Sequence, residues 1–321
     1  MGLRCLLFIW LAASAVSATT MPVIGILSQE AKSLQKYFPD VQYHSYIAAS
    51  YVKYIESAGA RVVPIWIGRD EQYYSDIVNK TNGILFPGGA TWFYDKNGYA
   101  DAGEMIYRAA IASNEAGRFF PLWGTCLGME LIFHVELDGV NVRADCDSHK
   151  ISLPLKFVSD YRQSRMFRNA SDQVIDVLSK EDVTVNSHMF CITPTNFTKF
   201  GLDKSFKYMS TNEDVNGLTF ISSFESTKYP FYGVQFHPEK NSFEFVHKQD
   251  SYVNHSKDAV TVAQYFANFF VEQARKNENS FPTPQEEYNH LIYNFQTEFL
   301  ASKGASYQQA YMFTQADNER R

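Results

Sequence analysis

The stretch Pro121-Leu122-Trp123-Gly124-Thr125-Cys126-Leu127-Gly128 is an apolar run that ends in a Gly-x-Cys-x-Gly sequence, and a helical pattern follows at 129–135. A strand, tight turn and helix place the turn residue on a strained elbow, and the flanking glycines allow the close backbone approach that the turn requires. Unpaired N–H groups and the positive end of the helix dipole then face the Cys126 sulfur and favour the nucleophilic thiolate. The stretch predicts a cysteine nucleophile, although a structural cysteine in a glycine-bounded turn has the same pattern.

A histidine and a glutamate follow a strand predicted at 231–236. In His237-Pro238-Glu239 the first and third side chains share a face of an extended backbone, which the proline keeps extended. Glu239 can then bond one imidazole nitrogen and leave the other for Cys126, as an orienting group, base and nucleophile would be arranged. Alone, the pair also fits a surface histidine and glutamate; together with the elbow it favours catalysis.

Another strand, predicted at 83–86, ends in Pro87-Gly88-Gly89-Ala90. Glycines at the carboxyl end of a strand let backbone N–H groups face a crevice, as an oxyanion hole requires. We therefore predict that the N–H groups of Gly89 and Leu127 form such a hole, with an ordinary Gly-Gly turn as the alternative.

Strands and helices alternate along the first half of the chain. Strands are predicted at 23–27, 61–67, 83–86 and 119–124, and helices at 46–58, 70–80 and 102–115. This alternation is typical of parallel strands with right-handed crossovers, and ligands bind beyond the carboxyl ends of such strands. The later part is expected to hold antiparallel strands between 151 and 230, short and long helices at 171–179 and 258–274, and a polar surface segment from 278. The sequence thus predicts an open, mostly parallel α/β sheet flanked by helices, with added antiparallel strands, in a single domain at 19–321.

The three motifs, in this order, resemble those of the class I glutamine amidotransferases, which implies a flavodoxin-like sheet. Longer segments, at 46–64, 123–128 and 232–240, are similar to the gamma-glutamyl hydrolase family, and the resemblance runs from about Pro22 to Tyr311.

This resemblance implies a cysteine hydrolase that cleaves the gamma-glutamyl bonds of folylpoly-gamma-glutamates and of antifolate polyglutamates through a thioester. It assigns catalysis to Cys126, His237 and Glu239. It also implies that His188 contacts substrate, although a lone loop histidine is usually only solvated. A homodimer and delivery to the lysosome or the extracellular space are further implications of the family.

The amino terminus supports a secretory protein. Arg4 precedes an apolar run at 5–15 and small residues at 16–18, which predicts a signal peptide at 1–18. Sequons for N-glycosylation follow at Asn79, Asn169, Asn196 and Asn254. Removal of the signal peptide leaves Cys126, Cys146 and Cys191, an odd number that indicates a free thiol. The spacing leaves open whether Cys146 and Cys191 are paired.

Composition restricts the partners. The chain has 321 residues, 45% of them hydrophobic, with 29 basic against 35 acidic residues and no basic run of five, which argues against nucleic acid and anionic membranes. A polyglutamate substrate would need a local basic patch; Lys240 is a candidate, and a solvated lysine is the simpler interpretation. The remaining histidines lack metal-ligand spacing, and Gly88-Gly89 lacks a phosphate-binding pattern, so no metal and no cofactor are expected.

Two other functions share these features. A glutaminase subunit of an amidotransferase would carry all three motifs, but the signal peptide and the lack of a synthetase domain argue against it. A catalytically silent secreted binding protein would have no reason to retain Cys126, His237 and Glu239.

Overall fold

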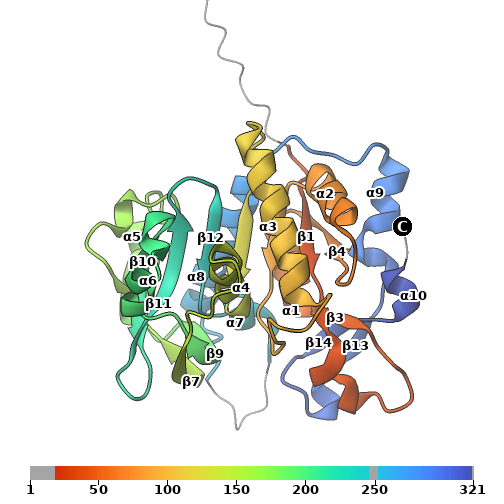
Figure 1. Ribbon diagram of the computed structural model, residues 1–321. Helices are drawn as coiled ribbons and strands as arrows, with labels where there is room; N and C mark the ends of the chain where they lie inside the picture. Colours follow the sequence, from red (N-terminus) through yellow and green to blue (C-terminus); the bar gives the residue numbers. More distant parts are fainter. Residues whose placement is uncertain (1–18, 246–251, 320–321) are drawn as a thin grey trace, which may run out of the picture.

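A computed structural model describes residues 19–245 and 252–319 (Figure 1). The strands of its large sheet are, in spatial order, β4 (Arg61–Ile65), β1 (Val23–Leu27), β5 (Gly83–Phe86), β6 (Leu122–Thr125), β12 (Phe231–Val234), β11 (Thr219–Ser226), β10 (Phe206–Glu213) and β8 (Lys156–Phe157). The pairs from β4 through β12 are parallel, and β11, β10 and β8 pair antiparallel. The predicted mostly parallel sheet with added antiparallel strands is therefore confirmed. The predicted signal peptide at 1–18 lies outside the described residues.

Helices cover both faces of this sheet. The helices of the described residues are α1 (Ala49–Glu56), α2 (Glu71–Lys80), α3 (Tyr99–Glu115), α4 (Leu127–Glu136), α5 (Asp172–Lys180), α6 (Pro194–Lys199), α7 (Lys240–Phe243), α8 (Lys257–Ala274), α9 (Pro284–His290) and α10 (Gln315–Asn318). Alternate strand residues point to opposite faces. Ile84 and Phe86 belong to the apolar core under α2, α3 and α4, whereas Leu85 belongs to the core under α1 and α8 (Figure 1). The sheet is thus buried on both sides, as its near-continuous apolar strands require.

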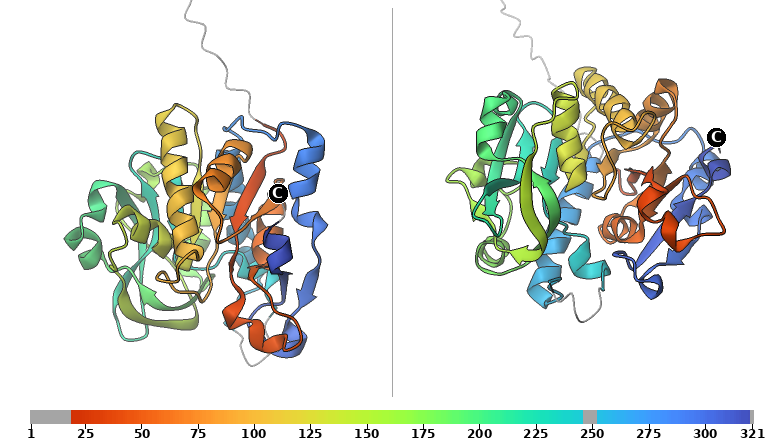
Figure 2. Two further views of the ribbon diagram at one scale, coloured as in Figure 1. Left: turned by 45° about the vertical axis from the view of Figure 1, so that its right-hand side comes forward. Right: turned by 60° about the horizontal axis from the view of Figure 1, so that its bottom comes forward.

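Two smaller sheets lie at one end of the molecule. The strands β7 (Ala144–Leu153) and β9 (Thr184–Cys191) form an antiparallel pair, and the other sheet has the order β13 (Thr297–Phe299), β14 (Gln309–Phe313), β3 (Ser45–Ala48) and β2 (Gln29–Glu30). Figure 2, right, shows the yellow-green pair on one side of this end and the red and dark blue strands on the other. A disulfide between Cys146 and Cys191 joins β7 to β9, with Cα atoms 5.8 Å apart, and so answers the pairing question.

Predicted helix starts agree with the structure where a side chain caps the helix. Asp70 accepts from the Tyr73 N–H and Ser171 accepts from the Val174 N–H, at the starts of α2 and α5. Such caps satisfy backbone donors that lack partners in the first turn. Among the described residues, no helix is long and apolar enough to cross a bilayer.

Two expectations were wrong. Residues 46–48 were expected to begin a helix, but they form β3, because this segment pairs with β14 from the far end of the chain. The C-terminal segment was expected to lie on the surface, yet it supplies β13 and β14 and buries Leu300 and Phe313 completely. Both differences come from one long-range pairing, which local sequence patterns do not reveal.

Candidate active site

Cys126 occupies the sharp turn between β6 and α4. Its φ of 52° is unusual for a residue with a side chain and places it in a strained conformation at the N-cap of α4. Its N–H donates to the Val234 carbonyl at 2.8 Å, which fixes the turn against β12. A Cβ at Gly128 would overlap the Phe86 carbonyl oxygen, so only glycine lets α4 approach β5 this closely. The strained elbow predicted from the sequence is present.

His237 and Glu239 form a buried pair just after β12. The backbone N–H of His237 donates to the Val185 carbonyl at 2.8 Å, and this bond holds the turn against β9. The Nδ1 atom of His237 lies 2.7 Å from Oε1 of Glu239, and both side chains are almost fully buried. A carboxylate accepts hydrogen bonds, so the tautomer that suits this contact carries its proton on Nδ1 and leaves the Nε2 lone pair available. The order of sulfur, imidazole and carboxylate expected from the sequence is compatible with this geometry.

Gly88 brings the thiol and the imidazole together. The strands β5, β6 and β12 are parallel neighbours, with Phe86 beside Gly124 and Thr125 beside Val234, so the residues after them meet at one edge. A Cβ built on Gly88 would lie 2.7 Å from Cε1 of His237 and 3.0 Å from Cβ of Cys126. These two residues also line the same cavity, whose volume is about 340 Å³. The structure therefore places the predicted nucleophile and base side by side.

The residues that carry the predicted oxyanion donors line this cavity. Gly89 and Leu127 both line it. The neighbouring Gly88 N–H donates instead to the Tyr51 hydroxyl at 2.8 Å. Of the two glycine amides in this turn, Gly89 is thus the better placed to bind an oxyanion.

Burial controls the charge on the sulfur. It raises the pKa of the Cys126 thiol, and the Glu130 carboxylate raises it further, while Lys240 and the Leu127 N–H lower it. The expectation that the helix terminus favours a thiolate at rest is therefore wrong, because loss of hydration outweighs the favourable dipole. The thiol must lose its proton to a neighbouring base when it reacts.

Burial also keeps His237 neutral. It lowers the pKa of this imidazole, and the Lys240 cation lowers it further, while Glu239 raises it. A neutral imidazole beside a thiol can accept the thiol proton. Sulfur and imidazole are consequently both uncharged in the resting site.

The family follows from comparison with known proteins. A profile of the family described as Peptidase C26 matches residues 22–239. The gamma-glutamyl hydrolase of Rattus norvegicus is 39% identical over 305 residues, which cover 94% of this chain and 93% of the relative. The Homo sapiens gamma-glutamyl hydrolase is 40% identical, covering 91% and 89%, and gamma-glutamyl hydrolase B of Dictyostelium discoideum is 36% identical, covering 92% and 84%. The chain belongs to the gamma-glutamyl hydrolase family.

A solved structure from Thermoplasma acidophilum, titled as part of a putative GMP synthase, is 13% identical to the chain. The match covers 79% of this chain and 94% of the other, with a TM-score of 0.45. This likeness is too low to carry a conclusion.

In this member of the gamma-glutamyl hydrolase family, His188 is not a solvated loop residue. It lies on β9, is buried, and lines the cavity that contains Cys126. Its Nδ1 lies 3.0 Å from the Phe190 carbonyl and its Nε2 lies 3.1 Å from Oδ1 of Asn186. Burial, with a smaller contribution from His237, lowers the pKa of His188 to about 3, so the side chain is neutral at physiological pH.

Several residues around Cys126 were missed by the sequence reasoning. Gln235 donates to Oε1 of Glu130 at 3.0 Å and lies 3.7 Å from the Cys126 sulfur. Arg143 donates to the other Glu130 oxygen at 3.3 Å, and burial raises the pKa of Glu130 to about 7. For Glu130 the sequence did offer an indication: it follows Cys126 by four residues, and this spacing on a helix predicts that the two side chains are neighbours. Arg143 and Gln235 come from other elements and had none.

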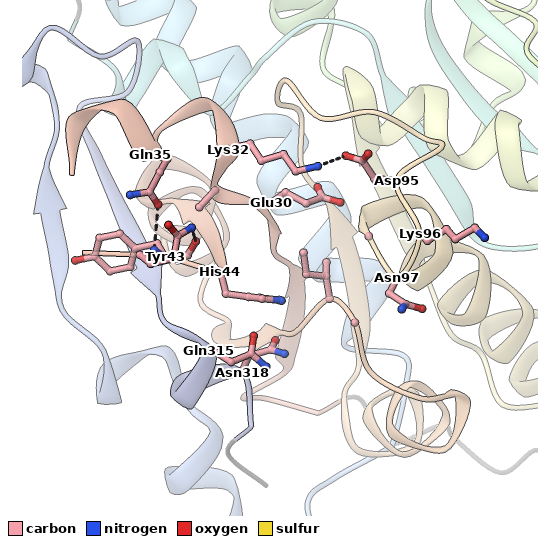
Figure 3. A pocket seen from close by; sticks show the side chains of 15 residues that line it. Glu30, Lys32, Gln35, Tyr43, His44, Asp95, Lys96, Asn97, Gln315 and Asn318 are labelled. Atoms are coloured by element: carbon pink, nitrogen blue, oxygen red, sulfur yellow. Dashed lines mark hydrogen bonds and ion pairs between the residues drawn. The ribbon is translucent and has the colours of Figure 1, made fainter. Parts of the chain in front are cut away.

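A larger pocket, of about 670 Å³, lies elsewhere and lacks these groups. Figure 3 shows the charged side chains Glu30, Lys32 and Asp95 among its lining residues. Neither Cys126 nor His237 lines it. Size alone would therefore select the wrong pocket. Within the part of the chain that the structure describes, no three His, Cys, Asp or Glu residues are grouped to hold a metal.

Proposed function

We propose that the chain hydrolyses gamma-glutamyl bonds with Cys126 as nucleophile, His237 as general base and acid, and Glu239 as the orienting carboxylate. The observation that carries this proposal is the meeting of Cys126 and His237 around Gly88, in one cavity, with Glu239 bonded to the far side of the imidazole. Membership of the gamma-glutamyl hydrolase family supports the substrate bond.

In the proposed reaction, His237 Nε2 takes the thiol proton while the Cys126 sulfur attacks the gamma-carbonyl carbon. The N–H groups of Leu127 and Gly89 stabilise the resulting oxyanion, and donors of this kind contribute about 3 kcal/mol each. The imidazolium then protonates the leaving alpha-amino group, and the carbon–nitrogen bond breaks to give a thioester. His237 next activates a water molecule, which hydrolyses the thioester and restores the thiol. Glu239 stabilises the imidazolium in both halves of the reaction.

The substrates we propose are folylpoly-gamma-glutamates and their antifolate analogues, which are strongly anionic. Basic side chains line the cavity, namely Arg143, His149, Lys150 and Lys240. Lys240 is only 7% exposed, so it is a cavity residue and not a solvated surface lysine. These groups support binding of a substrate with several carboxylates in a protein whose net charge is −6.

Product analysis tests this function. Incubation with a pentaglutamyl folate should release glutamate or short gamma-glutamyl peptides, and free glutamine should be hydrolysed poorly. Preferred hydrolysis of glutamine would instead support the glutaminase alternative. Lack of turnover of both compounds would favour a binding protein.

The rate should depend on pH through His237. Burial lowers the pKa of His237 below the ordinary value of 6.5, so the base stays neutral in mildly acidic solution. As the pH is lowered, kcat/KM should therefore fall only when the pH reaches this lowered pKa and the imidazole becomes protonated. Lys240 lowers this pKa and Glu239 raises it, so Lys240→Met should move the acidic limb to higher pH and Glu239→Gln to lower pH. Profiles of kcat/KM from about pH 4 to about pH 8 measure both shifts. Shifts in the same direction would contradict the assignment.

A methyl group at Gly88 should disturb the pair directly. Gly88→Ala would place Cβ against His237 and Cys126, and displacement of about 1 Å should lower kcat roughly 100-fold. Gly103→Ala is the matched control, because its Cβ would lie 2.5 Å from Leu131 Cδ2, between α3 and α4. That variant should lose stability in thermal unfolding without a comparable loss of kcat. Equal losses of kcat in the two variants would contradict the proposal that the close fit of Cys126 and His237 around Gly88 determines the rate.

We further propose a secretory route, with delivery to the lysosome or the extracellular space, and a homodimer. Asn79 and Asn169 are exposed, which favours them as glycan sites. The amides of Asn196 and Asn254 donate to the carbonyls of Val142 and Asp182, so a glycan there would compete for the Nδ2 atoms that make these bonds. Peptide mapping after glycosidase treatment and sedimentation of the secreted protein test these points.

A continuous core cluster that runs from Ile24 to Phe313 supports the single-domain assignment.

A further inference from the structure

Two aromatic side chains stand exposed beside the catalytic cavity: Trp92, which lines it, and Tyr94, which stacks on Trp92. Trp92 is 48% exposed and Tyr94 is 73% exposed, and their rings are stacked with centroids 5.5 Å apart and planes 19° from parallel. Trp92 lines the cavity that contains Cys126 and His237. Large aromatic side chains bury much apolar surface when they find a partner, so an exposed pair beside a cavity indicates a ligand contact.

The loop that carries the pair is held firmly between β5 and α3. Phe93, between the two exposed rings, is buried against His134 with centroids 4.8 Å apart. The Thr91 hydroxyl donates to Glu30, and Lys32 pairs with Asp95 at 2.8 Å (Figure 3). The loop is thus anchored on both sides of the rings, which limits the entropy that binding would cost.

Apolar side chains continue across the cavity mouth. Met189, which is 65% exposed, and Phe190 line the cavity from β9. The Arg143 guanidinium lies 4.7 Å from the ring of Phe93 and 4.8 Å from that of Phe190, so it links the two sides. The cavity therefore has an aromatic and apolar rim in addition to its cations and its reactive groups. A chain of glutamate residues alone has no aromatic surface that could contact such a rim.

We propose that Trp92 and Tyr94 form a stacking platform for a flat aromatic group carried at one end of the gamma-glutamyl substrate. The inference rests on the proposed function and deepens it, because it assigns the part of the site that distinguishes aromatic-capped substrates from plain gamma-glutamyl chains. The platform binds the aromatic group in the ground state and the transition state alike, since it is remote from the bond that breaks. It therefore affects KM and leaves kcat nearly unchanged.

Steady-state kinetics with two substrates test this. One is a gamma-glutamyl oligomer that bears a flat aromatic group at its amino end, and the other is the same oligomer with an acetyl group there. Trp92→Ala and Tyr94→Ala should raise KM for the aromatic substrate about 10-fold, with little change for the acetyl substrate. Trp92→Phe keeps an aromatic ring, so its KM for the aromatic substrate should stay close to that of the original protein. Tyr288→Ala, which removes an exposed ring from α9, should change neither KM. Equal changes for both substrates, or no change for either, would overturn the platform.

A binding measurement separates this inference from the proposed function. Trp66 and Trp123 are buried, so Trp92 is the exposed tryptophan of the described residues. Titration of a Cys126→Ala variant with the aromatic substrate should quench its fluorescence, and the additional change Trp92→Ala should remove the quenching. Quenching without turnover by the unmodified protein would retain the platform and reject the hydrolase. Turnover with no quenching that depends on Trp92 would retain the hydrolase and reject the platform.

Discussion

Replacement of Cys126 by alanine should lower kcat at least roughly 10,000-fold, because it removes the atom that forms the thioester. The oxyanion donors and the cavity remain, so substrate binding should survive almost unchanged. The small decrease in side-chain volume at this buried position should cost little stability. The rate measured with a pentaglutamyl folate and the melting temperature together test this expectation.

Thiol labelling supplies an independent check. Within the described residues Cys126 is the free cysteine, since Cys146 and Cys191 form a disulfide. A thiol-reactive probe should therefore label one site, and the Cys126→Ala variant should take up none. Because Cys126 lines the cavity proposed to bind substrate, substrate should protect it from the probe. Hydrolysis by the alanine variant at more than about 1% of the original rate would exclude covalent catalysis by this residue.

Replacement of His237 by alanine should lower kcat roughly 1,000-fold to 10,000-fold. The effect is large because burial and Glu130 raise the pKa of the Cys126 thiol, so the sulfur cannot ionise without an adjacent base. For the same reason, an increase of pH to about 9 should restore little activity, since the thiol remains protonated there. Added imidazole should restore part of the rate by occupying the space left beside Gly88.

Glu239→Gln is the matched control for this experiment. Glutamine keeps an oxygen that can accept a hydrogen bond from Nδ1–H but lacks the charge that stabilises the imidazolium. The decrease in kcat should therefore be smaller than for His237→Ala, at about 10-fold to 100-fold. A His237→Ala variant that regains nearly full activity at about pH 9 would contradict the raised thiol pKa.

Local sequence determined much of the parallel sheet. The strands β1 and β5 begin and end where the sequence predicts, because each is a short apolar run bounded by residues that break a strand. The start of α2 was also predictable, because Asp70 caps the helix from within the same segment. In contrast, β3 was mistaken for the start of a helix. Its apolar residues suit either structure, and β14, which selects the strand, lies more than 200 residues away in the chain.

The site divides along the same line. The sequence by itself determined the order of its parts: the elbow at Cys126, the pair His237 and Glu239, and the glycine turn, since each is a short motif at the end of a strand. Tertiary structure alone decided the charge on the sulfur, which local dipoles predicted wrongly, because burial is a property of the whole fold. It also brought Arg143 and Trp92 to the cavity and Gln235 to within 3.7 Å of the Cys126 sulfur, because contacts between distant segments depend on how the whole chain packs.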